Sequence, residues 1–196
     1  MSDVTSRGAD GVGRSQDRRW RTRDIVVVAV IAAAFGVFFA ALDAAFAAVN
    51  AGAGSPMNLL YGGWLLPAVV APVIVRKPGA ALFAELVAAA VSMLVLSQYG
   101  ADTLLSGFLQ GIGAEIVFAV FRYRDYRWAV VALASVVSAT LAFAHDWIIY
   151  YQGTAVGVMG LTYVFMLISA AVLMPIVTFA VVRALRQAGA LRGFPA

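Results

Sequence analysis

Long stretches of hydrophobic residues, separated by short polar segments, make up most of the chain. An apolar stretch of roughly 17–25 residues is needed to cross the hydrocarbon layer of a membrane as an α-helix. The stretches lack the period-two alternation that is typical of strands in a membrane barrel. The pattern therefore predicts six transmembrane helices, at Ile25–Val49, Leu59–Val75, Ala80–Leu96, Leu104–Phe121, Trp128–Tyr151 and Leu161–Ala184.

The connections between these stretches are too short to hold a second domain. Residues 50–56, for example, read Asn-Ala-Gly-Ala-Gly-Ser-Pro, a composition typical of turns. We expect an all-α membrane protein, with a single compact six-helix bundle over residues 24–186 and a short cytoplasmic tail at 187–196. Residues 1–23 are polar and lack the hydrophobic centre of a signal peptide, so they are expected to form a disordered cytoplasmic tail.

Composition supports a membrane protein and narrows the chemistry. Hydrophobic residues make up 63% of the 196 residues and charged residues only 12%, about half the charged fraction of a typical globular domain. The chain has no cysteine, which excludes disulfides, a thiol nucleophile and thiolate metal sites.

The basic residues indicate how the chain lies in the membrane. Lysine and arginine near short loops stay on the cytoplasmic side, and all 14 of them fall at span ends that a six-span arrangement places on one side. We therefore expect a multi-pass protein of the cell membrane with both termini in the cytoplasm. The net charge of +4 is divided among these membrane edges, so nucleic acid binding is not expected. The basic residues are Arg7, Arg14, Arg18, Arg19, Arg21, Arg23, Arg76, Lys77, Arg122, Arg124, Arg127, Arg183, Arg186 and Arg192.

Four carboxylic acids lie inside the predicted spans. A carboxylate at the bilayer centre costs roughly 2.5–3.5 kcal/mol on insertion scales, so each is a functional candidate. Asp43 and Asp146 lie near the outer ends of their spans and could face an external cavity. Glu85 and Glu115 share a depth nearer the inner side, where they could line the floor of that cavity or share a proton. The alternative is a protonated carboxyl that donates to a neighbouring backbone carbonyl.

Aromatic and amide side chains join these acids in the outer half. The glycines Gly107 and Gly111 form one helix stripe, which indicates close helix packing, whereas Gln110 is a candidate ligand contact. His145 is the only histidine and cannot form a metal site alone, so a hydrogen-bonding role is expected. Acids and aromatic rings without a basic residue favour a cationic or neutral ring compound, such as a vitamin-like heterocycle. The candidate binding residues are Asp43, Tyr61, Trp64, Glu85, Gln110, Glu115, His145, Asp146, Trp147 and Tyr150.

Four segments carry a family resemblance: Arg23-Asp24-Ile25-Val26, Leu60-Tyr61-Gly62-Gly63-Trp64, the run from Arg76 to Glu85, and Gln110-Gly111-Ile112-Gly113-Ala114-Glu115. Together they resemble the YkoE family of substrate-binding membrane subunits, or S components, of energy-coupling factor (ECF) transporters. That family is linked to thiamine and its hydroxymethylpyrimidine precursor. The resemblance runs from about Arg23 to Arg186.

The resemblance implies a non-catalytic subunit without a cofactor that captures the vitamin or its precursor from outside. A transmembrane coupling (T) protein and two cytoplasmic ATPases would be its partners. The absence of a Gly-x-x-x-x-Gly-Lys-[Ser/Thr] motif agrees with ATP hydrolysis by a partner. Small residues at Ala29 and Ala33, and at Ala32 and Gly36, would let a partner helix approach the first span, although packing within the subunit accounts for them equally well.

Two other functions remain open from the sequence. A proton-coupled secondary transporter could use Glu85 and Glu115 as proton carriers, but no clear internal repeat is present. An intramembrane enzyme would need a nucleophile motif, and Leu104-Leu105-Ser106-Gly107 lacks the glycine two positions before the serine. The sequence does not distinguish thiamine, hydroxymethylpyrimidine and related heterocycles.

Overall fold

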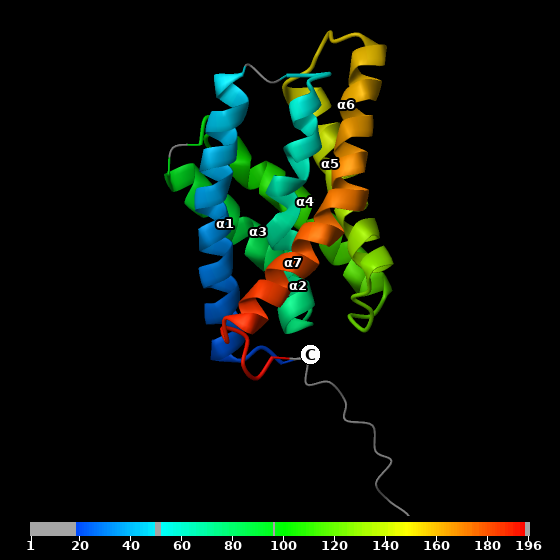
Figure 1. Ribbon diagram of the computed structural model, residues 1–196. Helices are drawn as coiled ribbons and strands as arrows, with labels where there is room; N and C mark the ends of the chain where they lie inside the picture. The colour runs from blue at the N-terminus through cyan, green and yellow to red at the C-terminus, as the bar shows by residue number, and fades with distance from the viewer. Residues whose placement is uncertain (1–18, 50–51, 96, 195–196) are drawn as a thin grey trace, which may run out of the picture.

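The computed structural model describes residues 19–194, apart from 50–51 and 96, and the elements formed by these residues are all helical (Figure 1). The first 18 residues of the predicted disordered tail therefore lie outside the described part of the chain. The elements, in chain order, are α1 (Thr22–Ala48), the 3₁₀ helix η1 (Pro56–Leu65), α2 (Leu66–Val75), α3 (Ala80–Leu94), α4 (Asp102–Val120), α5 (Trp128–Ile149), α6 (Val156–Ile168), the π-helix η2 (Ser169–Leu173) and α7 (Met174–Gln187).

These elements form the six predicted spans. The η1 and α2 helices together make the second span, and α6, η2 and α7 make the sixth. Five spans are long and apolar enough to cross a membrane, and α3 is a shorter apolar helix of 15 residues. The predicted fold class is confirmed. The last span begins at Val156 rather than Leu161, because Gly157 and Gly160 are tolerated in a helix that other helices support.

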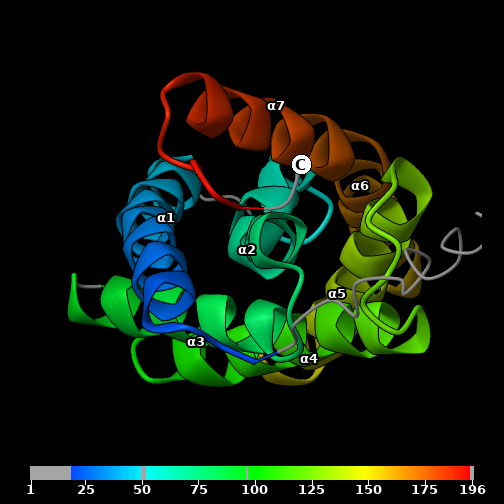
Figure 2. The same ribbon diagram turned by 90° about the horizontal axis from the view of Figure 1, so that it is seen from below.

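The α2 helix occupies the centre of the bundle. Figure 2 shows it surrounded by the other helices, and all ten of its residues are buried. Its sequence, LPAVVAPVIV, is hydrophobic on every side, which is the pattern of a helix without an exposed face. The bundle is thus a ring of helices packed around one central helix.

Glycines bring the outer helices close together. A Cβ atom on Gly107 would lie 2.7 Å from the Ala89 Cβ, and one on Gly111 would lie 2.9 Å from the Leu82 Cα. Such distances leave no room for a side chain, so α4 packs directly on α3. The predicted glycine stripe is confirmed as a close-packing surface.

The beginning of α1, the end of α2, the α4–α5 connection and the end of α7 lie at one end of the bundle, here called the terminal end (Figure 1). The opposite end, which carries the α1–η1, α3–α4 and α5–α6 connections, is called the loop end. At the terminal end the buried Lys77 pairs with Asp24 at 2.6 Å. Arg23 donates to the Gly193 carbonyl at 2.8 Å. The predicted C-terminal tail therefore folds back toward the start of α1, at least as far as Phe194, whose ring lies 4.4 Å from the Arg23 guanidinium carbon.

Candidate ligand-binding site

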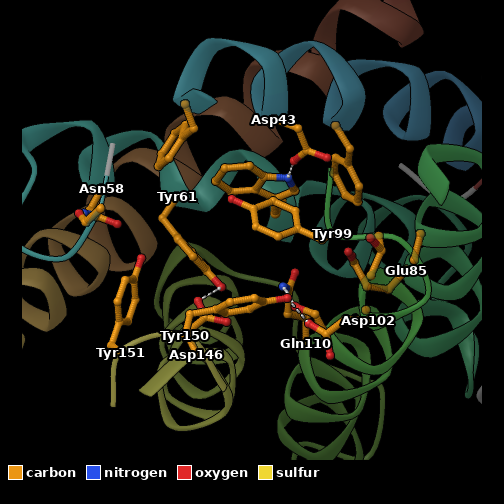
Figure 3. Close-up of a pocket in the computed structure, with 18 residues that line it drawn as sticks. Asp43, Asn58, Tyr61, Glu85, Tyr99, Asp102, Gln110, Asp146, Tyr150 and Tyr151 are labelled. Carbon is orange, nitrogen blue, oxygen red and sulfur yellow. Dashed lines mark hydrogen bonds between the residues drawn. The ribbon is translucent and has the colours of Figure 1, made fainter. Parts of the chain in front are cut away.

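A cavity of about 240 Å³ extends from the loop end toward the middle of the bundle (Figure 3). It is enclosed by α1, η1, α3, α4, the end of α5 and the adjoining loops. Aromatic rings, acids and small residues make up its wall. The lining residues are Phe39, Asp43, Phe46, Gly52, Asn58, Tyr61, Trp64, Glu85, Ala89, Tyr99, Asp102, Thr103, Ser106, Gly107, Gln110, Asp146, Tyr150 and Tyr151.

The η1 helix presents two aromatic rings to the cavity because two glycines set its other side against the bundle. A Cβ atom on Gly62 would lie 2.6 Å from the Met174 side chain, and one on Gly63 would lie 2.7 Å from the Leu42 side chain. The Gly62 N–H also donates to Ser169 Oγ of the π-helix at 2.9 Å. With that face fixed, Tyr61 and Trp64 lie on the cavity side.

Asp43 of α1 fixes the position of Trp64 in the cavity wall by a hydrogen bond. The Trp64 indole N–H donates to Asp43 Oδ1 at 3.0 Å, and the Ser97 hydroxyl donates to Asp43 Oδ2 at 2.6 Å. The Trp64 ring packs edge-on against Phe46, with centroids 4.7 Å apart. One buried acid thus connects an aromatic wall of the cavity to the α3–α4 loop.

The α3–α4 loop contributes Tyr99. Its ring packs edge-on against Tyr150 at a centroid distance of 5.6 Å. Burial, with a smaller contribution from the Asp43 carboxylate, raises the pKa of Tyr99 to about 12. The phenol therefore keeps its proton at neutral pH and remains a hydrogen-bond donor.

Glu85 and Gln110 form a polar part of the wall on the α3–α4 side (Figure 3). Both side chains are buried. Glu85 Oε2 accepts the Ala68 N–H at 2.9 Å, and the Gln110 amide donates to Ser106 Oγ at 2.8 Å. Glu85 Oε1 and Gln110 Oε1 have no hydrogen-bond partner among the described residues. Two acceptors with no protein donor are therefore located at the cavity.

A chain of hydrogen bonds runs along the loop-end side of the cavity. Tyr61 donates to Asp146 Oδ2 at 2.9 Å, and Tyr150 donates to Asp102. His145 lies between the two acids, with Nδ1 3.0 Å from Asp146 Oδ1 and Nε2 3.1 Å from Asp102 Oδ1. The network connects η1, α4 and α5.

Most of the binding residues predicted from the sequence line this cavity. They come from five different helices and the α5–α6 loop, so the fold brings together positions that are distant in the chain. The predicted residues that line the cavity are Asp43, Tyr61, Trp64, Glu85, Gln110, Asp146 and Tyr150.

Glu115, by contrast, lies near the terminal end, away from the cavity. Its carboxylate accepts the N–H groups of Gly79 at 2.5 Å and Ala81 at 3.0 Å, and the Tyr123 hydroxyl at 2.8 Å. It therefore caps the first turn of α3, where N–H groups lack helical partners. The prediction that Glu115 shares the cavity floor with Glu85 is wrong, because capping of α3 fixes its carboxylate outside the cavity.

His145 and Trp147 also lie outside the cavity wall. Successive residues of an α-helix point about 100° apart, so the two neighbours of Asp146 cannot share its direction. His145 is buried behind the wall. Trp147 is 44% exposed, and its ring packs against Phe143. The prediction of direct ligand contacts for these two residues is not supported by their positions.

Asp102 is the main site residue that the sequence analysis missed. It is the first residue of α4 and resembles an ordinary acid at a helix N-terminus. A signal was nevertheless present, because Asp102 is the only charged residue in the three connections that the predicted spans leave at this end, 50–58, 97–103 and 152–160. Such an isolated charge among apolar and small polar residues marks a position beside a polar site.

Among the residues that the structure describes, no group of three or more histidine, cysteine or acidic side chains is arranged to hold a metal ion. The ring nitrogens of His145 both face carboxylates. The chemistry of the cavity is thus that of aromatic stacking and hydrogen-bond acceptance.

Comparisons with known proteins agree with this description. A family model described as "ABC-type cobalt transport system, permease component" matches residues 23–141. YkoE of Bacillus subtilis (strain 168), a protein assigned as an HMP/thiamine permease, is 34% identical over 179 residues, which cover 90% of this chain and 89% of YkoE. The crystal structure of an S-component of an ECF transporter matches with a TM-score of 0.85 and 32% identity, covering 89% of this chain and 90% of that one. This chain therefore belongs to the family of YkoE-like S-components, the non-catalytic membrane subunits that bind the substrate of ECF transporters.

Proposed function

We propose that the cavity binds thiamine or its hydroxymethylpyrimidine precursor, HMP. The relative YkoE is assigned to these compounds, and the cavity has matching chemistry. At about 240 Å³ it is slightly smaller than the roughly 300–1,000 Å³ usual for ligand pockets. That size supports a ligand of one or two rings.

The observation that carries the proposal is the pair of unpartnered acceptors. Buried polar atoms are nearly always hydrogen-bonded, so Glu85 Oε1 and Gln110 Oε1 call for donors from a ligand. The aminopyrimidine ring of HMP and thiamine carries an exocyclic amine with two N–H groups. An amine that donates to both oxygens would satisfy them, while the ring packs among Tyr61, Trp64 and Tyr99.

The charge of the cavity supports an unphosphorylated ligand. Four acids line it, and no lysine or arginine is among its described lining residues. Such a site favours the cationic thiazolium of thiamine through the acids and the aromatic faces. It disfavours phosphate esters, whose negative charge would be repelled by the acids. The four acids are Asp43, Glu85, Asp102 and Asp146.

Cobalt, which appears in the description of the matching family model, is less well supported as the substrate. A transition-metal ion needs several convergent imidazole or carboxylate ligands, and the described residues hold no such cluster. The carboxylate oxygens of Asp43 and Asp146 already accept hydrogen bonds from protein side chains.

A transmembrane T protein and two ATPases are the proposed partners, as expected of an ECF transporter. On α1 the Ala32 and Gly36 stripe is buried within the subunit, since a Cβ on Gly36 would lie 2.5 Å from the Ala88 carbonyl oxygen. Ala29 and Ala33 are only half-buried, which supports them as the pair that a partner helix contacts. The basic terminal end would face the cytoplasm, and the cavity would open to the outside.

Calorimetric titration of the purified chain in detergent, without partner subunits, tests the proposal. Thiamine or HMP is expected to bind with saturation. A thiamine analogue with a carbonyl oxygen in place of the exocyclic amine is expected to bind at least tenfold more weakly, because it has no exocyclic N–H groups to donate to Glu85 and Gln110. The diphosphate ester should likewise bind more weakly than thiamine. If folded protein binds neither thiamine nor HMP, the ligand assignment is wrong.

The variant Glu85→Gln sharpens this test. It keeps the side-chain volume and one oxygen that can accept the Ala68 N–H, but it puts an NH₂ group in the place of Oε1. A donor left without an acceptor at a buried site costs about 1–3 kcal/mol. The expected loss is therefore about tenfold or more in affinity. Glu115→Gln is the matched control, since the same change at the terminal end should leave affinity within about twofold. Equal affinities for the two variants would place the ligand elsewhere.

A further inference from the structure

His145 is a buried side chain that stands behind the cavity wall and touches two of its acids. It is 6% exposed and does not line the cavity. Its Nε2 lies 3.1 Å from Asp102 Oδ1 on α4, and its Nδ1 lies 3.0 Å from Asp146 Oδ1 on its own helix. Both ring nitrogens therefore face carboxylates.

The donors and acceptors of this cluster define how many protons it holds. A neutral imidazole has one N–H donor and one acceptor nitrogen, and an ionised carboxylate only accepts. A neutral His145 would thus satisfy one acid and repel the other through its lone pair. Two hydrogen bonds to two carboxylates require an imidazolium, in which both nitrogens carry hydrogen.

The groups around His145 favour this arrangement. Asp102 of α4 and Asp146 of α5 are its charged neighbours, and the Tyr150 ring lies 6.1 Å from the imidazole. Tyr61 of η1 donates to the far oxygen of Asp146, and Tyr150 donates to the far oxygen of Asp102. The phenols therefore occupy the acceptor oxygens that His145 leaves open.

We propose that His145 is a positioning residue for the ligand site: as an imidazolium, it donates to both Asp102 and Asp146 and holds them, with a combined charge of −1, at the cavity. This inference rests on the proposed function, since it concerns the acids that face the bound ligand. Without His145, two carboxylates would repel each other in a low-dielectric site. Tyr61 and Tyr150 would then lose their fixed acceptors, and two parts of the cavity wall would be free to move.

Nitrogen NMR of the imidazole tests the protonation directly and needs no ligand. His145 is the only histidine of the chain, so protein labelled with ¹⁵N-histidine and freed of any affinity tag gives one pair of ring signals. Two protonated nitrogens at pH 7 are the expected result. A neutral ring with one bare nitrogen would overturn the proposal, whether or not thiamine or HMP binds.

The Asp146→Asn variant adds a second spectroscopic readout. It removes one of the two carboxylate acceptors, so the imidazolium is expected to lose its proton at a lower pH than in the unmodified chain. An unchanged titration midpoint would contradict the bridging role.

Ligand affinity tests the positioning role. His145→Ala should weaken binding of whichever compound binds, thiamine or HMP, by at least tenfold, although His145 makes no contact with the cavity. Ser135→Ala is the control, because Ser135 is buried on the same helix and donates only to the Val131 carbonyl. The Ser135→Ala variant should bind the ligand with the affinity of the unmodified chain. Unchanged affinity in folded His145→Ala would overturn the positioning role, and if that variant does not fold, the NMR result decides.

Discussion

At the scale of single residues, the cavity is organised by acids that hold aromatic side chains. Asp43 fixes the indole of Trp64, and Asp146 fixes the phenol of Tyr61. The two rings also pack against each other, with centroids 5.4 Å apart. Each polar contact thus sets the direction of a large apolar surface, which makes the cavity a preformed stacking site.

Trp64 is expected to report ligand binding. It is the only one of the four tryptophans that lines the cavity, so thiamine should quench part of the intrinsic fluorescence of the chain. Trp64→Phe should abolish the quenching and weaken binding roughly tenfold, because Asp43 loses its indole donor. Trp147→Phe is the control, since Trp147 lies outside the wall. Quenching that survives in Trp64→Phe but disappears in Trp147→Phe would contradict the site.

Sequence reasoning found most of the cavity residues because acids and amides inside apolar spans are conspicuous. It misplaced Glu115, since depth along a span does not reveal which neighbour a carboxylate contacts, and the Gly79 and Ala81 N–H groups were the nearer partners. It missed Asp102 and Tyr99 because both lie outside the apolar stretches. Their roles depend on how the loops fold over the cavity, which composition does not encode.

At the scale of elements, close approach between helices depends on glycine. Gly36 of α1 faces α3 so closely that an added Cβ would lie 2.5 Å from the Ala88 carbonyl oxygen and 2.6 Å from the Val91 Cβ. Gly160 of α6 has no such neighbour within 4 Å. The same residue type therefore has a packing role in one helix and none in another.

The pair of substitutions Gly36→Ala and Gly160→Ala tests this difference. Overpacking typically costs about 1–3 kcal/mol, so Gly36→Ala is expected to lower the melting temperature measured in detergent. Gly160→Ala should leave it unchanged or raise it, because alanine is the better helix former by up to about 1 kcal/mol. Equal melting temperatures would mean that α1 can shift away from α3 without loss.

The hydrophobic pattern was sufficient to predict the number of spans. In lipid the backbone N–H and C=O groups of each apolar stretch must be hydrogen-bonded within the protein, so each stretch forms a helix. The pattern did not predict that the second span begins as a 3₁₀ helix or that the sixth contains a π-helix. The two irregular helices are connected by the hydrogen bond from the Gly62 N–H to Ser169 Oγ. They arise from contacts between distant segments, and so they leave no periodic signal in the sequence.

At the scale of the whole molecule, the basic residues predict the orientation in the membrane. The chain contains no cysteine, so single cysteines can be introduced without further changes. Ala155→Cys at the loop end and Ala188→Cys at the terminal end both replace exposed alanines. In intact cells a membrane-impermeant maleimide should label Ala155→Cys only, and Ala188→Cys should react after permeabilisation. The reverse pattern would invert the topology.

The buried α2 helix has a consequence for how the protein is made. Helices enter the membrane in chain order, so α2 must first stand in lipid, before α3 to α7 exist to surround it. Its ten residues, LPAVVAPVIV, carry no hydrogen-bonding side chain. Exposure of these side chains to lipid before the later helices are inserted therefore costs little free energy. Glu85 and Gln110 arrive later on α3 and α4 and can be covered as they emerge. The chain thus inserts a helix without polar side chains early and its polar cavity residues later, among neighbouring helices. This order suits insertion at the translocon as well as the finished bundle.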